Sequence, residues 1–128
     1  MIGYTTLGSN DLDVALAFYD GVLALLGGKR VMTMPDDRGF TLYGAGRGKP
    51  MLAITRPYDG KPASVGNGTM VALGAGSREL VGRVHAQAIE LGATDDGAPG
   101  TRGPEAMNFY AAYFRDPDGN KLCIYKAG

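Results

Sequence analysis

The strongest constraint in this sequence is an internal repeat. A strand-like segment, an amphipathic helix and three further strand-like segments follow one another over residues 2–56, and the same order returns over residues 69–126. The local match is Leu7-Gly8-Ser9 against Leu73-Gly74-Ala75, an offset of 66 residues. A chain of 128 residues that repeats such a unit is predicted to be an α+β protein built from two tandem βαβββ modules.

The first repeat begins with a strand over residues 2–8. Ser9-Asn10-Asp11 then offers a helix N-cap, and Gly27-Gly28 ends the helix. The apolar side chains of this helix recur at three- and four-residue steps: Leu12, Ala15, Leu16, Tyr19, Leu23 and Leu26. The three extended segments that follow are Lys29–Met34, Gly39–Tyr43 and Met51–Arg56.

A run of turn-forming residues separates the two repeats. Residues 57–68 are rich in Pro, Gly, Asp and Asn, which is typical of a linker. We therefore expect one domain over residues 1–128, divided into module one (1–56), the linker (57–68) and module two (69–128).

The second repeat follows the same plan. Ser77 can cap its helix and Gly92 ends it. The apolar face of this helix consists of Leu80, Val81, Val84, Ala88 and Leu91. Residues 93–108 carry a weaker strand signal, whereas Asp116–Asn120 predicts a hairpin turn. The strands expected on either side of that turn are Phe109–Arg115 and Lys121–Lys126.

Charge and cysteine content exclude several classes of protein. Thirteen basic and thirteen acidic residues cancel and form no basic patch, so we expect no nucleic-acid partner. The apolar runs are too short to cross a bilayer, and residues 1–6 do not have the pattern of a signal peptide, so we expect no membrane partner. The single cysteine excludes an internal disulfide and favours a reducing compartment. A soluble cytoplasmic protein is therefore expected.

Several segments resemble signatures of the glyoxalase/bleomycin resistance/extradiol dioxygenase (vicinal oxygen chelate) superfamily. They are Thr6–Leu12, Ala17-Phe18-Tyr19, Glu90–Ala93 and, most specific of all, Phe114–Leu122. The resemblance covers nearly the whole chain. It implies two βαβββ modules that form a curved mixed sheet around a cleft. In the metal-dependent members, the metal ligands occupy inward-facing positions on the strands.

Carried over one by one, those ligand positions fall on Tyr4, Ala53, Met70 and Cys123. The family enzymes use His, Glu or Gln there. Divalent metal ions prefer imidazole and carboxylate donors, whereas this set offers a phenol, a methyl group, a thioether and one thiol. The only histidine, His85, falls in the middle of a helix. The sequence therefore predicts neither a metal site nor another cofactor.

Strand alternation predicts which other side chains line the cleft. Tyr125, Thr6, Thr55 and Ala72 should face the same side as the four carried-over positions. Such a wall is mostly apolar with a few hydroxyl groups, which suits a small organic ligand. The strand residues expected to face the helices instead are Leu7, Leu52, Ile54, Leu73, Leu122 and Ile124.

Four further residues have competing interpretations. Arg56 and Arg102 could contact an anionic ligand at the cleft mouth, or they could be ordinary surface residues on turns. Tyr110 could line the cleft or belong to a contact between subunits. His85 borders the apolar face of its helix, which favours a partly buried, hydrogen-bonded histidine over a catalytic one.

These features favour a metal-free protein that binds a small molecule and forms a homodimer. Tyr4, Tyr125 and the threonines would orient the ligand. Two alternatives stay open, and no catalytic residue can be named from the sequence. One is a glyoxalase-like lyase or isomerase, or a dioxygenase-related enzyme, with an altered site. The other is a dimeric structural module without a ligand.

Overall fold

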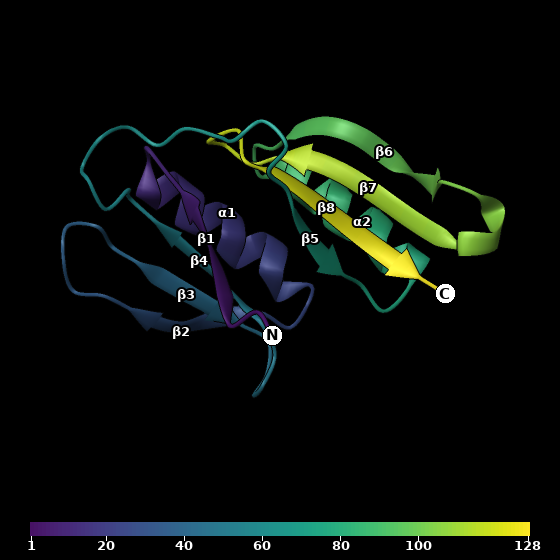
Figure 1. Ribbon diagram of the computed structural model, residues 1–128, viewed down its shortest axis with the longest axis horizontal. Coiled ribbons are helices and arrows are strands. Elements are labelled where there is room, and N and C mark those ends of the chain that lie inside the picture. Colours follow the sequence, from purple (N-terminus) through teal and green to yellow (C-terminus); the bar gives the residue numbers. More distant parts are fainter.

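The computed structural model describes all 128 residues and contains the predicted repeat. Figure 1 shows the two modules side by side, with α2 behind β7 and β8. The first module contains β1 (Tyr4–Gly8), α1 (Leu12–Ala24), β2 (Lys29–Thr33), β3 (Thr41–Gly44) and β4 (Met51–Thr55). The second contains β5 (Val71–Gly74), α2 (Arg78–Glu90), β6 (Thr94–Arg102), the 3-10 helix η1 (Glu105–Met107), β7 (Phe109–Arg115) and β8 (Lys121–Ala127). The α+β fold is confirmed.

Each module forms its own four-stranded mixed sheet. The strand orders are β1-β4-β3-β2 and β5-β8-β7-β6, and in both sheets only the first pair is parallel. The registers are equivalent, since Thr6 is opposite Ala53 in one sheet and Ala72 is opposite Cys123 in the other. No hydrogen-bonded ladder joins the sheets, so β1 and β5 each keep one unpaired edge.

The helices begin and end through local hydrogen bonds. The side chain of Asp11 caps α1 by accepting a bond from the Val14 backbone, and Ser77 caps α2 through Leu80 in the same way. Gly27 follows α1 with a φ of 78°, a left-handed conformation that glycine adopts without strain. Neither helix is long and apolar enough to span a lipid bilayer.

The two modules share a hydrophobic core between the sheets and the helices. Phe18 of α1 contacts Phe114 of β7 with a distance of 6.2 Å between ring centroids, and α1 also contacts α2. Alternation along the strands is confirmed, because five of the six residues expected to face the helices lie in this core and Leu73 packs against it. Those five are Leu7, Leu52, Ile54, Leu122 and Ile124.

A buried polar cluster also joins the modules, and we call it the Asp116 junction: Tyr19, Asp116, Asn120 and the carbonyl of Gly8. The Tyr19 hydroxyl donates to Asp116 Oδ2 at 2.5 Å, and Asn120 Nδ2 donates to the same oxygen at 2.9 Å. Asn120 Nδ2 also donates to the Gly8 carbonyl at 3.0 Å. The hairpin turn of module two is thereby attached to both α1 and β1 of module one.

We expect Tyr19→Phe to lower the free energy of unfolding by about 1.5–3 kcal/mol, because it leaves a buried carboxylate without one donor. Urea denaturation followed by circular dichroism measures the change. Tyr58→Phe removes a hydroxyl from an exposed side chain and should leave stability unaltered. Equal stabilities for the two variants would contradict a linking role for the junction.

The buried phenol of Tyr19 should also make the protein less stable at alkaline pH. Burial, reinforced by the charge of Asp116, raises the pKa of Tyr19 well above its usual value. The folded state therefore holds this proton more tightly than the unfolded state, in which the phenol titrates near pH ~10. Stability should be fully retained below that pH and fall above it, and the fall should be shallower in Tyr19→Phe. Urea denaturation midpoints from pH 8 to 11 test this.

Candidate ligand site

The open face of module one, opposite its helix, contains a hollow of about 500 Å³. Alternation along β1 directs Tyr4 and Thr6 to this face, while Leu7 points into the core. The rings of Tyr4 and Phe40 are nearly perpendicular, with a centroid distance of 5.8 Å. The other lining residues are Gly8, Arg38, Thr55, Pro57, Tyr58, Asp59, Pro62, Ala63 and Ser64.

The linker forms one wall of this hollow because it is attached to the start of module one. The Asn10 side chain accepts a hydrogen bond from the Ala63 backbone at 2.6 Å and donates one to the Ala63 carbonyl at 3.1 Å. A Cβ atom on Gly8 would lie only 3.0 Å from the Cβ atom of Ala63. Glycine at position 8 therefore allows the linker to approach β1 closely.

One guanidinium group in the hollow has no carboxylate partner. Arg38 lies over the Tyr58 ring at 5.1 Å and takes part in none of the four ion pairs of the chain. Asp59 also lines the hollow, and its carboxylate accepts a hydrogen bond from the Lys61 backbone. The Thr55 hydroxyl already donates to the carbonyls of its neighbours. Arg38 is therefore the one cation available to a ligand at this face.

The sequence-predicted site residues do not all gather in one place. Tyr4, Thr6 and Thr55 line the hollow on module one, and Ala53 is buried in the same sheet. Arg56 does not line the hollow, and it donates to the Asp37 carbonyl at 2.7 Å. Met70 and Ala72 line a different hollow, beside β5.

The open face of module two carries Cys123, Tyr125 and Arg102. The rings of Tyr125 and Phe109 are stacked at 5.4 Å, and Arg102 lies 5.5 Å from the centre of the Tyr113 ring. Arg102 also donates to the Ala98 carbonyl, so its own strand uses part of its donor capacity. None of these residues lines the hollow on module one or the one beside β5.

Tyr110 and His85 lie away from the open faces. Tyr110 packs against the core on the helix-facing side of β7, with the Arg78 guanidinium 5.0 Å from its ring centre. Alternation is the physical reason, because Phe114, four residues along the same strand, is also in the core. His85 is buried and its Nε2 lies 3.0 Å from Asp95 Oδ1, which matches a hydrogen-bonded structural histidine.

The residues present do not fit the metal site implied by the family resemblance. No group of three or more His, Cys, Asp or Glu side chains gathers anywhere in the structure. Ala53 offers no donor atom and Met70 offers a thioether. Burial raises the pKa of the Cys123 thiol above its usual value, although the neighbouring Tyr113 hydroxyl acts in the opposite direction. A protonated thiol is a poor ligand for a divalent cation.

Sequence reasoning missed Arg38, Phe40 and Tyr58 as parts of the hollow. Phe40 lies in an expected strand and could have been assigned to a face by alternation. Arg38 and Tyr58 lie outside the strands, and no periodic signal places such residues. The attachment of Asn10 to Ala63 spans 53 positions and has no local signature.

We expect Cys123 to react slowly with Ellman's reagent at pH 8 in the native protein and rapidly in urea, because the thiol is both buried and largely protonated. The matched control is Ala72→Cys in a Cys123→Ala background, which places a thiol on the exposed neighbour across the β5–β8 pair. If Cys123 in the folded wild type and the cysteine at position 72 in the folded variant react at equal rates, Cys123 is accessible.

Comparison with known proteins agrees with this architecture. A family model described as Glyoxalase/Bleomycin resistance protein/Dioxygenase superfamily matches residues 1–124. The crystal structure of a glyoxalase/bleomycin resistance protein from Albidiferax ferrireducens T118 is 35% identical, with a TM-score of 0.82 and 98% of each chain covered. No curated protein matches.

Two further structures are similar at lower identity. A glyoxalase-related enzyme from Fulvimarina pelagi is 19% identical with a TM-score of 0.75, and the match covers 98% of this chain and 87% of that one. A lactoylglutathione lyase from Agrobacterium tumefaciens is 26% identical with a TM-score of 0.68, and the match covers 98% of this chain and 92% of that one. On the family match and the 35% identity together, this chain belongs to the glyoxalase/bleomycin resistance protein/dioxygenase superfamily.

Proposed function

We propose that this protein binds a small organic molecule, without a metal ion, in the hollow on module one. The observation that carries the proposal is the combination of aromatic rings, a threonine side chain and one unpaired guanidinium group in a space of about 500 Å³. Its volume is within the range of small-ligand sites, but only four of its twelve lining residues are hydrophobic, so its wall is more polar than the sequence predicted. We place this role in the cytoplasm, where a free thiol such as Cys123 is stable.

The side chains define the kind of ligand expected. Tyr4 and Phe40 offer ring edges and faces for a flat apolar body. Thr6 is exposed at the same face and can bond to a polar substituent. Arg38 favours a carboxylate, because its planar fork of donors matches two carboxylate oxygens. An aromatic carboxylate is therefore the best first probe.

A lyase is the second candidate, favoured by the 26% identity with the Agrobacterium lactoylglutathione lyase over nearly the whole chain. Because the metal-ligand positions do not fit a hard cation, such an enzyme would have to use phenol groups such as Tyr4 as acid or base. Turnover of the methylglyoxal–glutathione adduct by the protein as purified would favour this candidate. Stoichiometric Ni, Zn, Mn or Fe in protein made without an affinity tag would favour a metal-dependent version of it.

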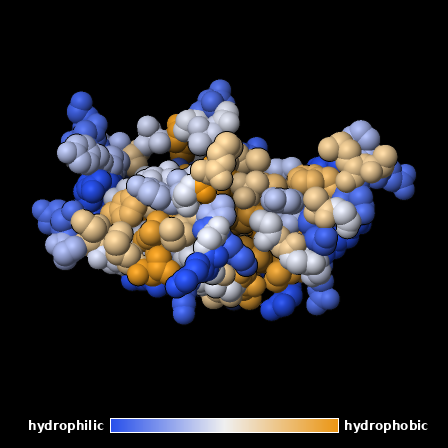
Figure 2. All heavy atoms as spheres, turned by 60° about the horizontal axis from the view of Figure 1, so that its bottom comes forward, coloured by the Kyte–Doolittle hydropathy of each residue, from blue (hydrophilic) through white to orange (hydrophobic).

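We also propose that a second copy of the chain covers the open sheet faces. Tyr4, on the open face of module one, keeps 54% of its surface exposed, and a second copy would cover this ring. Figure 2 shows hydrophobic residues in several separate patches on one side of the molecule. A homodimer related by a two-fold axis would bury such surface.

For ligand binding, we expect 2-naphthoate to bind and Thr6→Trp to weaken its affinity by about tenfold or more, because the indole ring fills the hollow. Isothermal titration calorimetry measures both affinities. Thr94→Trp, at the exposed start of β6, introduces the same side chain on the other module and should bind like the wild type. Identical affinities for all three proteins would show that 2-naphthoate does not bind in the hollow on module one.

For assembly, we expect light scattering on a sizing column to give twice the 13.4 kDa mass of the chain. Tyr4→Glu should shift the protein toward the monomer, because it places a charge on an open sheet face. Val14→Glu adds the same charge to an exposed position on the opposite, helical side and should not alter the mass. A monomeric wild type would contradict the dimer and leave the ligand proposal standing.

A further inference from the structure

We infer a second binding site, for an aliphatic molecule with one negative head group, in a groove between the two modules. This seam groove has a volume of about 570 Å³ and lies beside the free edge of β5, near the end of α1. Eleven of its 17 lining residues are hydrophobic. Its size suits a single small ligand.

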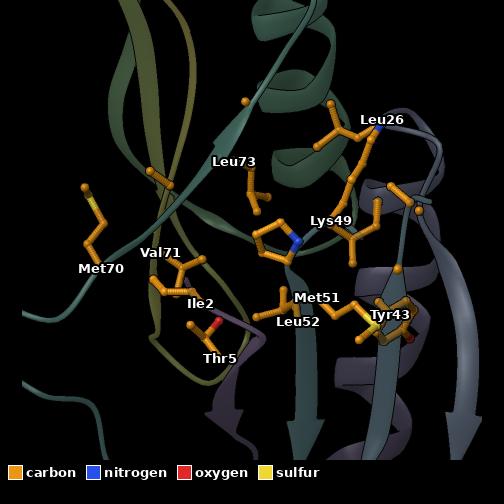
Figure 3. Close-up of a pocket in the computed structure, with 17 residues that line it drawn as sticks. Ile2, Thr5, Leu26, Tyr43, Lys49, Met51, Leu52, Met70, Val71 and Leu73 are labelled. Atoms are coloured by element: carbon orange, nitrogen blue, oxygen red, sulfur yellow. The ribbon is translucent and has the colours of Figure 1, made fainter. Parts of the chain in front are cut away.

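The walls of the seam groove come from both modules. Leu26 follows α1, Leu52 belongs to β4, and Val71 and Leu73 belong to β5 (Figure 3). Tyr43 contributes its ring, while its hydroxyl is already used in hydrogen bonds to Asp20 and the Leu16 carbonyl. Most of the wall can therefore offer a ligand only apolar contact.

Lys49 is the only charged residue that lines the seam groove. Figure 3 shows its side chain extending toward Leu26, on the opposite side of the groove from Met70. Lys49 takes part in none of the ion pairs of the chain. A free ammonium group at one end of an apolar groove selects a ligand with an apolar body and an anionic end, because the charge is then paired and the apolar surface is removed from water.

The unpaired edge of β5 explains why the groove is open. Five consecutive residues, Met70–Gly74, line it, so the groove runs along the strand rather than across one of its faces. A strand from another chain could also occupy this edge. An uncharged backbone would leave Lys49 unpaired, however, so the charge favours an anionic ligand over an added strand.

The seam groove is distinct from the hollow on module one. The two share no lining residue, and the neighbouring residues Thr5 and Thr6 point to opposite sides of β1. A ligand in one site therefore touches no residue that lines the other. The inference does not rest on the proposed function.

The test compares decanoate with decyltrimethylammonium, which share an alkyl chain and differ in the sign of the head group. We expect decanoate to shift the methyl NMR signals of Leu26, Val71 and Leu73 and to bind about tenfold or more tightly than the cation. Lys49→Met should abolish this preference and retain the methyl shifts. Lys126→Met removes a charge from a half-buried residue of β8 that does not line the groove, and it should retain the preference.

Four results would overturn the inference. Equal affinity for the two amphiphiles in the wild type, or an unaltered preference in Lys49→Met, would show that Lys49 does not select the ligand. Shifts confined to the methyl groups of Thr6 and Ala63 would place decanoate in the other hollow. If the protein is a dimer and the methyl signals of Leu26, Val71 and Leu73 do not respond to decanoate, a second copy fills the groove. Competition with 2-naphthoate separates the sites, because decanoate in the seam groove should not displace it.

Discussion

The fold depends on one buried carboxylate. Asp116 directly follows β7 and accepts hydrogen bonds from the Tyr19 hydroxyl, the Asn120 side chain and two backbone amides of its own turn. A buried carboxylate is stable only when it is fully paired, so the turn, α1 and the end of β1 must be in place together. The junction and the shared core therefore link the two repeats, although each has a complete sheet of its own.

Local patterns were sufficient to predict the fold. Alternation placed Leu7, Ile54 and Ile124 on the core side because the direction of a side chain in a strand depends only on its neighbours along the chain. The separation of Tyr4 and Met70 into different hollows depends instead on how the modules pack. That packing is set by contacts such as Tyr19 with Asp116, 97 positions apart, which no periodicity reveals.

The chemistry of the strand positions explains why superfamily membership does not identify a reaction here. The same scaffold can support metal chemistry when its inward positions carry imidazole and carboxylate groups, but function follows the side chains rather than the fold. In this chain those positions carry Tyr4, Ala53, Met70 and Cys123, and the polar side chains in the hollow on module one are an arginine, an aspartate and several hydroxyls. The proposed role, binding of an organic molecule, is argued from these side chains and not from the fold.

The attachment of the linker has a consequence for how this protein can change over evolution. Asn10 and Gly8 hold Ala63 against β1, yet Tyr58 and Asp59, which contribute side chains to the hollow, belong to no strand of either sheet. Replacing those two residues would alter the shape and charge of the hollow without breaking a ladder hydrogen bond or opening the core. The lining of the hollow can therefore diverge through a short tethered loop without changing the scaffold.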